Sequence, residues 1–235
     1  IKACQMSTLF DQYGENYDAA MTKSIGFMGQ SHDYYTQAKA VHILSILRRH
    51  LGAPRQLAVL DVGSGVGKTD RFLSGGIGHL TGVDISATSV ERARRENPSV
   101  RYEVYDGRQL PFPAESFAAA FVICVMHHVA IPDRVALLQE VRRTLIPGGL
   151  LMIFEHNPLN PLTRLAVARC EFDRDAQLLT RGLSARLLKQ AGFTIAEKRF
   201  ILVSPFAFKG SGCLERAFCQ APLGAQYYVV GQKTG

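Results

Sequence analysis

The chain has 235 residues, 47% of them hydrophobic and 20% charged, and its formal net charge at pH 7 is +7. This length suffices for one sizeable core but hardly for two independent domains. No run of about 18 apolar residues occurs and the start lacks an apolar signal core, so we expect a cytoplasmic protein without a membrane span. The basic residues are spread along the chain, which argues against nucleic acid as a partner.

The five cysteines argue against a disulfide framework and a metal site. They form no Cys-x-x-Cys pair, and their number is odd. This pattern is typical of reduced thiols. We therefore expect no bound metal.

The first 54 residues are predicted to form a lid followed by an amphipathic helix. Residues 1–30 are polar and aromatic with weak periodicity, as expected of a lid. From residue 32 to residue 51, apolar side chains recur at intervals of three and four positions: Val41, Leu44, Leu47 and Leu51. Gly52 and Pro54 then end the helical pattern. We expect this helix to pack beside a sheet.

A strand predicted for residues 57–62 runs into glycines at positions 63, 65 and 67. Glycine permits a sharp turn and a close approach of the backbone to a ligand, and a following helix start offers unpaired N–H groups. A phosphate-binding loop would need glycine at Val62, and a dinucleotide fingerprint would need glycine at Lys68. The turn therefore predicts a nucleotide-like ligand of another kind.

Strands and helices are predicted to alternate from residue 57 to residue 155. The further strands lie at residues 79–85, 100–106, 117–125 and 150–154, with helices after residue 86 and from residue 132. This alternation indicates a parallel sheet with helices on both faces. A helix near residues 184–192 and strands at 193–203 and 226–231 complete the pattern.

Five side chains that can make polar contacts end predicted strands: Asp61, Asp84, Asp106, Cys124 and Glu155. Because the carboxyl ends of parallel strands meet at one edge, where ligands of such sheets bind, we expect these side chains to converge there. Asp84 suits a ligand with a ribose diol, since one carboxylate can accept hydrogen bonds from both hydroxyls.

Four motifs agree in order and spacing: the glycine turn, the acid at 84, Asp-Gly at 106–107 and Pro-Gly-Gly at 147–149. In this combination the chain resembles the class I S-adenosylmethionine-dependent methyltransferases of small molecules. The resemblance implies an α/β fold with a Rossmann-like, doubly wound seven-stranded sheet, mostly parallel with an antiparallel end strand. Residues 55–235 would form this core, with an acceptor-binding insert at about residues 156–182.

The resemblance also implies which residues hold the cofactor, S-adenosylmethionine. The methionine end would lie against Asp61, Gly63, Ser64 and Gly65. Asp84 would hold the ribose hydroxyls, and the adenine would contact Ile85, Asp106 and Gly107. Cys124 and Val125 would cover the sulfonium, although Cys124 equally suits a buried apolar position. Tyr17, in the lid, would hydrogen-bond the cofactor carboxylate.

Two pairs of residues are candidates for catalysis. His127 and His128 resemble the paired histidines of small-molecule O-methyltransferases, where one acts as base. Neighbours on a helix point about 100° apart, so we expect at most one of them to face the acceptor. Glu155 can orient a histidine or bind a hydroxyl, and His156 can itself act as base. Each of the four equally suits a purely structural place.

The sequence therefore predicts methyl transfer to a small molecule, at a hydroxyl oxygen, in the synthesis of a glycan, lipid or secondary metabolite. Nitrogen or carbon methylation stays open, as does a partner protein that binds the cofactor without catalysis. The Asp/Asn-Pro-Pro-Tyr/Phe signature of amino-directed DNA methyltransferases is absent after the fourth strand, where the chain reads CVMHHV. This absence argues against the amines of nucleic-acid bases as acceptors.

Overall fold

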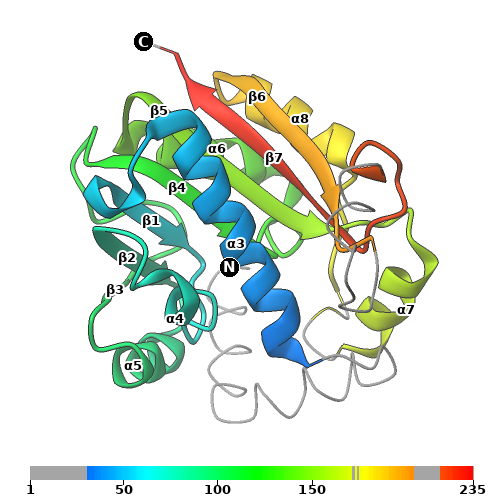
Figure 1. Cartoon of the computed structure of the whole chain (residues 1–235), viewed down its shortest axis with the longest axis horizontal. Helices are drawn as coiled ribbons and strands as arrows, with labels where there is room; N and C mark the ends of the chain where they lie inside the picture. The colour runs from blue at the N-terminus through cyan, green and yellow to red at the C-terminus, as the bar shows by residue number, and fades with distance from the viewer. Residues whose placement is uncertain (1–30, 171–172, 174, 204–217, 235) are drawn as a thin grey trace.

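The computed structural model describes residues 31–170, 173, 175–203 and 218–234. These residues form a seven-stranded sheet in the order β3-β2-β1-β4-β5-β7-β6, with helices packed against it (Figure 1). The strands are β1 (Ala58–Val62), β2 (His79–Asp84), β3 (Arg101–Val104), β4 (Phe117–Ile123), β5 (Leu145–His156), β6 (Phe193–Ile201) and β7 (Gln226–Lys233). The predicted doubly wound α/β fold is confirmed.

The helices are α3 (His32–Leu51), α4 (Asp70–Leu73), α5 (Ala87–Glu96), α6 (Arg134–Thr144), α7 (Pro161–Arg169) and α8 (Arg181–Gln190). Two single-turn 3₁₀ segments, η2 (Pro54–Gln56) and η3 (Ile131–Asp133), precede β1 and α6. The proposed lid at residues 1–30, with Tyr17, lies outside the described residues. The division into a lid, a core and an acceptor-binding insert stays a prediction.

The strands from β3 to β5 are parallel, and β7 is the reversed strand. β1 pairs in parallel with β2 and β4, and β4 pairs in parallel with β5. β7 comes last in the chain, lies between β5 and β6, and is antiparallel to both. The carboxyl ends of β1, β2, β4 and β5 therefore meet at one edge, as the alternating pattern predicted.

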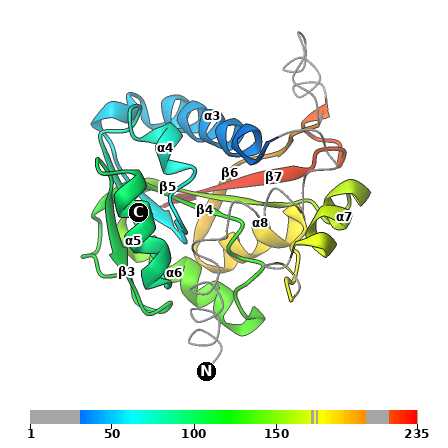
Figure 2. The same ribbon diagram turned by 90° about the horizontal axis from the view of Figure 1, so that it is seen from below.

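Two hydrophobic cores fill the space between the sheet and its helices. One contains side chains of α3, α4 and α5, and the other contains side chains of α6 and α8. Figure 2 shows α3 and α4 on one side of the sheet and α6 and α8 on the other. In β4, Phe121 faces the first core and Val122 the second, which explains why this strand is apolar throughout.

Helix α3 has the predicted bounds, and of the predicted apolar positions Leu47 is buried and Leu44 and Leu51 pack against the core, whereas Val41 does not. Its buried positions are Tyr35, Thr36, Lys39, Ala40, Ile43, Ile46 and Leu47, whereas Val41 is 60% exposed. Apolar residues occur around much of this helix, so its periodicity alone did not decide which stripe would pack on the sheet. The packed stripe carries Lys39, which is only 6% exposed.

Strand β5 begins at Leu145, earlier than predicted, and helix α6 ends before it at Thr144. The Pro-Gly-Gly segment at 147–149 lies inside this strand as an irregularity. Phe117 pairs with Leu145, but Ala119 pairs with Leu150, so the register shifts across the segment. A side chain at Gly149 would lie 3.0 Å from the Ala118 carbonyl oxygen.

Among the described residues, no helix combines the length and apolar character needed to cross a bilayer.

Candidate functional site

The three glycines between β1 and α4 all have positive φ angles, but their surroundings differ. A β-carbon at Gly63, where φ is +80°, would lie 2.3 Å from Val125 Cγ2. A β-carbon at Gly67, where φ is +72°, would lie 2.5 Å from the hydroxyl of Tyr102. At Gly65, where φ is +52°, no atom of another described residue beyond the chain neighbours lies within 4 Å of the added carbon. Gly65 is therefore the point of this turn that a ligand can approach.

Asp84 joins the glycine turn to the start of α5. Its Oδ2 accepts a 2.8 Å hydrogen bond from the Gly65 N–H, and its Oδ1 accepts a 2.9 Å bond from the Ser86 N–H. Ser86 in turn caps α5 through the Ser89 N–H. Ile85 follows and is half-buried. Asp84 thus shapes the turn itself, whatever else it holds, and its predicted ribose contact stays a prediction.

Below the turn, Asp61 and Asp70 form a buried carboxyl pair. Tyr102 donates a 2.8 Å hydrogen bond to Asp70 Oδ2. Burial, and then the proximity of Asp70, raises the pKa of Asp61 well above its usual range, and burial raises the pKa of Asp70 to about 6. Asp61 Oδ1 and the hydroxyl of Ser64 are buried and have no hydrogen-bond partner among the described residues.

Asp106 and Gly107 form an exposed turn beyond β3. Asp106 Oδ1 accepts 2.8 Å hydrogen bonds from the N–H groups of Gln109 and Arg108, and these bonds lower the pKa of the carboxyl. Gly107 has a φ of +77°. The carboxylate therefore closes its own turn, and its predicted contact with adenine stays a prediction.

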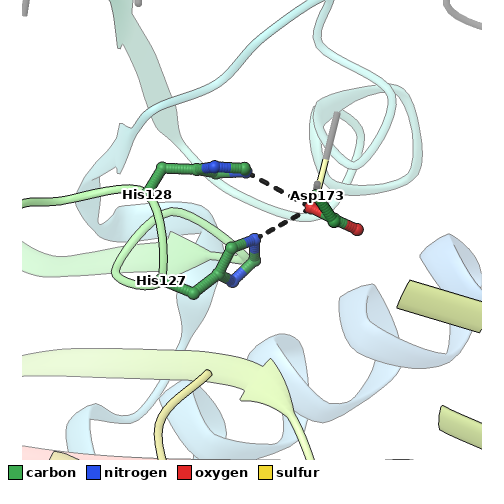
Figure 3. A group of neighbouring side chains, drawn as sticks. All are labelled: His127, His128 and Asp173. Carbon is green, nitrogen blue, oxygen red and sulfur yellow. Dashed lines mark hydrogen bonds and ion pairs between the residues drawn. The ribbon is translucent and has the colours of Figure 1, made fainter. Parts of the chain in front are cut away.

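A histidine–carboxylate cluster lies beyond β4 and β5 (Figure 3). His127 Nδ1 lies 2.6 Å from Glu155 Oε2, and His127 Nε2 lies 3.2 Å from Asp173 Oδ1. His128 Nε2 lies 3.4 Å from the same Asp173 oxygen. The two histidines stand in an irregular turn, not in a helix, so their rings converge. Both rings thus face one carboxylate, and the expectation that at most one of them faces the acceptor stays a prediction.

The carboxylates change the proton affinity of the histidines. Burial opposes a charge on His127, but Glu155 and Asp173 outweigh it and hold the pKa of His127 well above its usual range. Burial lowers the pKa of His128, despite its contact with Asp173. Burial would raise the pKa values of Glu155 and Asp173, but the imidazoles hold both below their usual range. The cluster therefore pairs two buried carboxylates with the imidazolium of His127, which supplies positive charge beside them.

His156 and Cys124 lie next to this cluster, joined by Gln226. The rings of His156 and His127 are 5.5 Å apart between centroids. Gln226 Nε2 lies 3.4 Å from His156 Nδ1 and 3.9 Å from Cys124 Sγ. Burial lowers the pKa of His156 to about 4 and raises that of the Cys124 thiol to about 11, so both are uncharged near pH 7. Cys124 has a φ of +55°, an unusual conformation for a residue with a side chain.

Three residues of this region were not found from the sequence. Asp173 lies in the segment after α7, where no periodic pattern distinguishes it from the neighbouring acids in the sequence. Gln226 begins β7, and Lys39 belongs to the buried face of α3. The charge of Lys39 lowers the pKa of both Cys124 and His156, which places its ammonium near them. The one signal in the sequence was that Lys39 lies on the same helical stripe as apolar residues of α3, which marks it as a lysine that can be buried.

Comparisons with known proteins agree with this fold. Residues 59–149 match the family model described as "Methyltransferase domain". A 2-methyl-6-phytyl-1,4-hydroquinone methyltransferase of Synechocystis is 33% identical over 108 residues, which are 44% of this chain and 33% of the relative. The 27-O-demethylrifamycin SV methyltransferase of Amycolatopsis mediterranei is 32% identical over 102 residues, 40% of this chain and 37% of the relative.

Human probable tRNA methyltransferase 9B is 37% identical over 97 residues, which are 41% of this chain and 20% of the relative. The chain thus spans well under half the length of these curated relatives. A putative methyltransferase solved in complex with the Haloferax volcanii activator Trm112 has a TM-score of 0.69 at 21% identity. That match covers 96% of this chain and 98% of the other, and at this identity it establishes the fold alone.

The matched segment begins in β1 and contains the glycine turn, Asp84 and Asp106. It therefore includes most of the residues that the sequence assigned to the cofactor. The match therefore identifies residues 59–149 as a methyltransferase domain, and the strand order and the glycine turn agree with the fold of the class I S-adenosylmethionine-dependent methyltransferases.

Proposed function

We propose that this chain transfers the methyl group of S-adenosylmethionine to a hydroxyl oxygen of a small molecule. The observation that carries the proposal is the cluster of buried histidines and carboxylates at the carboxyl ends of β4 and β5. A methyl acceptor needs such groups only if it must be positioned and lose a proton. A hydroxyl meets both conditions. Nitrogen and carbon acceptors are the alternatives, and the atom that carries the label in the product of the assay below separates them from oxygen.

The glycine turn fits the cofactor of the family. Gly65 faces open space, so a ligand can lie against its backbone. Two buried oxygens beside it, Asp61 Oδ1 and Ser64 Oγ, have no partner among the described residues and suit the ammonium and carboxylate of a methionine group. When bound, S-adenosylmethionine supplies an electrophilic methyl group. In this proposal Asp84, Ile85, Asp106 and Gly107 hold its adenosine part, with Cys124 and Val125 beside the sulfonium.

In this proposal His156 takes the proton of the acceptor hydroxyl. Its Nε2 makes no hydrogen bond with any described residue, whereas its Nδ1 faces Gln226. His127 is engaged at both nitrogens, so it positions its neighbours and is not the proton acceptor. Glu155, which belongs to β5, holds the His127 ring through Nδ1. Alignment and exclusion of water supply much of the remaining acceleration in a methyl transfer.

The arrangement of the basic residues supports a small acceptor. Arg94 and Arg142, one residue from each of two arginine doublets, hydrogen-bond backbone carbonyls of their own chain: Arg94 donates to Tyr102 O, and Arg142 donates to Gly192 O. Guanidinium groups used in this way do not form an open basic surface for a polyanion. The names of the relatives span a hydroquinone, a rifamycin and a tRNA methyltransferase, so the assay includes an RNA arm.

The test is calorimetric titration with S-adenosylmethionine, followed by label transfer from methyl-tritiated cofactor to simple hydroquinones, catechols, monosaccharides and bulk tRNA. We expect cofactor binding and labelling of a hydroxylated small molecule. His156→Ala should lower kcat by about 10²-fold or more while leaving cofactor affinity intact. His79→Ala is the matched control, because His79 is exposed at the opposite end of β2 from Asp84. Absent cofactor binding, or labelling of tRNA alone, would refute the proposal.

A further inference from the structure

Three side-chain atoms converge beyond β4 in the manner of metal ligands. They are His127 Nε2, His128 Nε2 and Asp173 Oδ1, and all lie within 4.8 Å of one another. Figure 3 shows both imidazole rings pointing at one carboxylate oxygen. The two histidines are neighbours in one turn, and the acid comes from the distant segment after α7. Convergence of two imidazoles and one carboxylate from separate segments is the donor set of many open transition-metal sites.

Glu155 determines which nitrogen of His127 is available. At 2.6 Å, the buried Glu155 carboxylate accepts a hydrogen bond from Nδ1–H, so the lone pair of a neutral His127 resides on Nε2. That lone pair points at the Asp173 oxygen, 3.2 Å away. In the absence of an ion, a proton on Nε2 makes this contact a hydrogen bond, and a bound cation would take the place of that proton. Carboxylate–histidine–metal triads hold their ligand in this same arrangement.

Two of the three distances between ligand atoms agree with an ion at the centre. Bonds of about 2.0–2.1 Å in tetrahedral geometry place neighbouring ligand atoms about 3.3 Å apart. The two histidine nitrogens lie 3.2 Å and 3.4 Å from Asp173 Oδ1. The side chains of His127 and Asp173 are 1% and 10% exposed, so the donors are largely removed from competing water. Glu155 and Asp173 add the negative charge that a divalent cation requires.

We propose that His127, His128 and Asp173 bind one divalent transition-metal ion, with Zn²⁺ as the best fit. Glu155 orients His127 and stays outside the coordination shell. Three protein ligands leave a coordination position open. Metal binding stands on the geometry alone. That the open position takes the acceptor oxygen, and makes its hydroxyl more acidic, rests on the proposed function.

This site contradicts the expectation of no metal, which was drawn from the cysteines. The ligands proposed here are histidines and one carboxylate, and Cys124 is not among them. Its thiol pKa is raised by burial, which disfavours the thiolate that a metal needs. His156 also contributes no ligand atom, although its ring is next to that of His127. It therefore provides a matched control within the same region.

The test is titration of the chelator-treated full chain with ZnCl₂ by calorimetry, with Co²⁺ absorption as a second readout. We expect one ion per chain and a Co²⁺ spectrum of low coordination number. His128→Ala and Asp173→Asn should each weaken Zn²⁺ binding at least about tenfold, and Glu155→Gln about 10–100-fold. His156→Ala should leave Zn²⁺ affinity unchanged. Thermal melts establish that each variant is folded, and the Co²⁺ spectrum of the unaltered chain requires no variant.

Absent Zn²⁺ binding, a Co²⁺ spectrum of the free aqua ion, or equal affinity in the unaltered chain and both ligand variants would overturn the site. The contacts would then be ion pairs of a protonated His127. Titration with S-adenosylmethionine in the presence of chelator separates this result from the proposed function. Cofactor binding without Zn²⁺ binding would refute only the proposed metal site. Zn²⁺ binding without cofactor binding would refute only the proposed methyl transfer.

Discussion

Replacing Gly63 or Gly65 with alanine separates the folding role of the glycine turn from its binding role. Both residues have positive φ, at +80° and +52°, so each substitution costs about 1–2 kcal/mol in the left-handed region. Only Gly63→Ala also creates a collision, because its β-carbon would lie 2.3 Å from Val125 Cγ2. Forcing such an overlap in a packed region adds about 1–3 kcal/mol.

Gly63→Ala should therefore lower the free energy of unfolding by about 2–5 kcal/mol, and Gly65→Ala by about 1–2 kcal/mol. For a chain of this size, 1 kcal/mol shifts Tm by about 2–4 °C, so the first variant should melt at least about 4 °C lower than the original chain. The β-carbon of Gly65→Ala enters open space at the point where a ligand approaches. Its S-adenosylmethionine affinity should fall about tenfold or more, because close backbone approach is lost.

The measurements are thermal unfolding by circular dichroism and calorimetric titration with S-adenosylmethionine on the same preparations. A Gly65→Ala variant that binds the cofactor as well as the original chain would refute the assignment of the turn as the cofactor's contact surface. Equal melting temperatures for the two variants would refute the steric argument, since both share the backbone penalty and only one has the collision.

Asp84→Asn should weaken cofactor affinity about tenfold in calorimetry, while the exposed Asp106→Asn should weaken it less, and the reverse order would contradict the ribose assignment. Glu197 binds Tyr228 and Arg49 and has its pKa lowered to about 2, despite opposing burial, so its stabilisation is complete above about pH 4.5 and is lost as pH falls towards 2. Glu197→Gln should reduce stability near pH 7 by about 1–3 kcal/mol and flatten that acid limb in denaturant titrations. Asp70 has a raised pKa of about 6, so its contribution to stability declines as pH rises from about 4 to 6, and Asp70→Asn should remove this decline.

The sequence predicted the elements best where local chemistry determines them. The glycines at 63, 65 and 67 have positive φ, as a sharp turn requires, and the apolar run of β4 is a central strand buried on both faces. The helix at His32–Leu51 also ends where Gly52 predicted its end. Only Val41 was misplaced on its buried face, because Val41 and Ile43 are equally apolar and only the contact with the sheet distinguishes them.

The site shows the same limit more sharply. Asp84, His127 and Glu155 could be nominated because each follows or ends a parallel strand, and such ends share an edge. Neither the convergence of His127 and His128 nor the arrival of Asp173 could be read from spacing. A turn in place of a helix aligned the two rings, and the path of the segment after α7 brought the acid to them.

The doubly wound sheet and the turn at its edge follow from the order of residues alone, because hydrophobic periodicity and glycine act through near neighbours. The electrostatic character of the site depends instead on how the folded chain packs. Burial of Glu155 and Asp173 beside His127 joins residues 28 and 46 positions apart in the chain. No local pattern specifies such a contact, because its energy depends on how distant segments exclude water together.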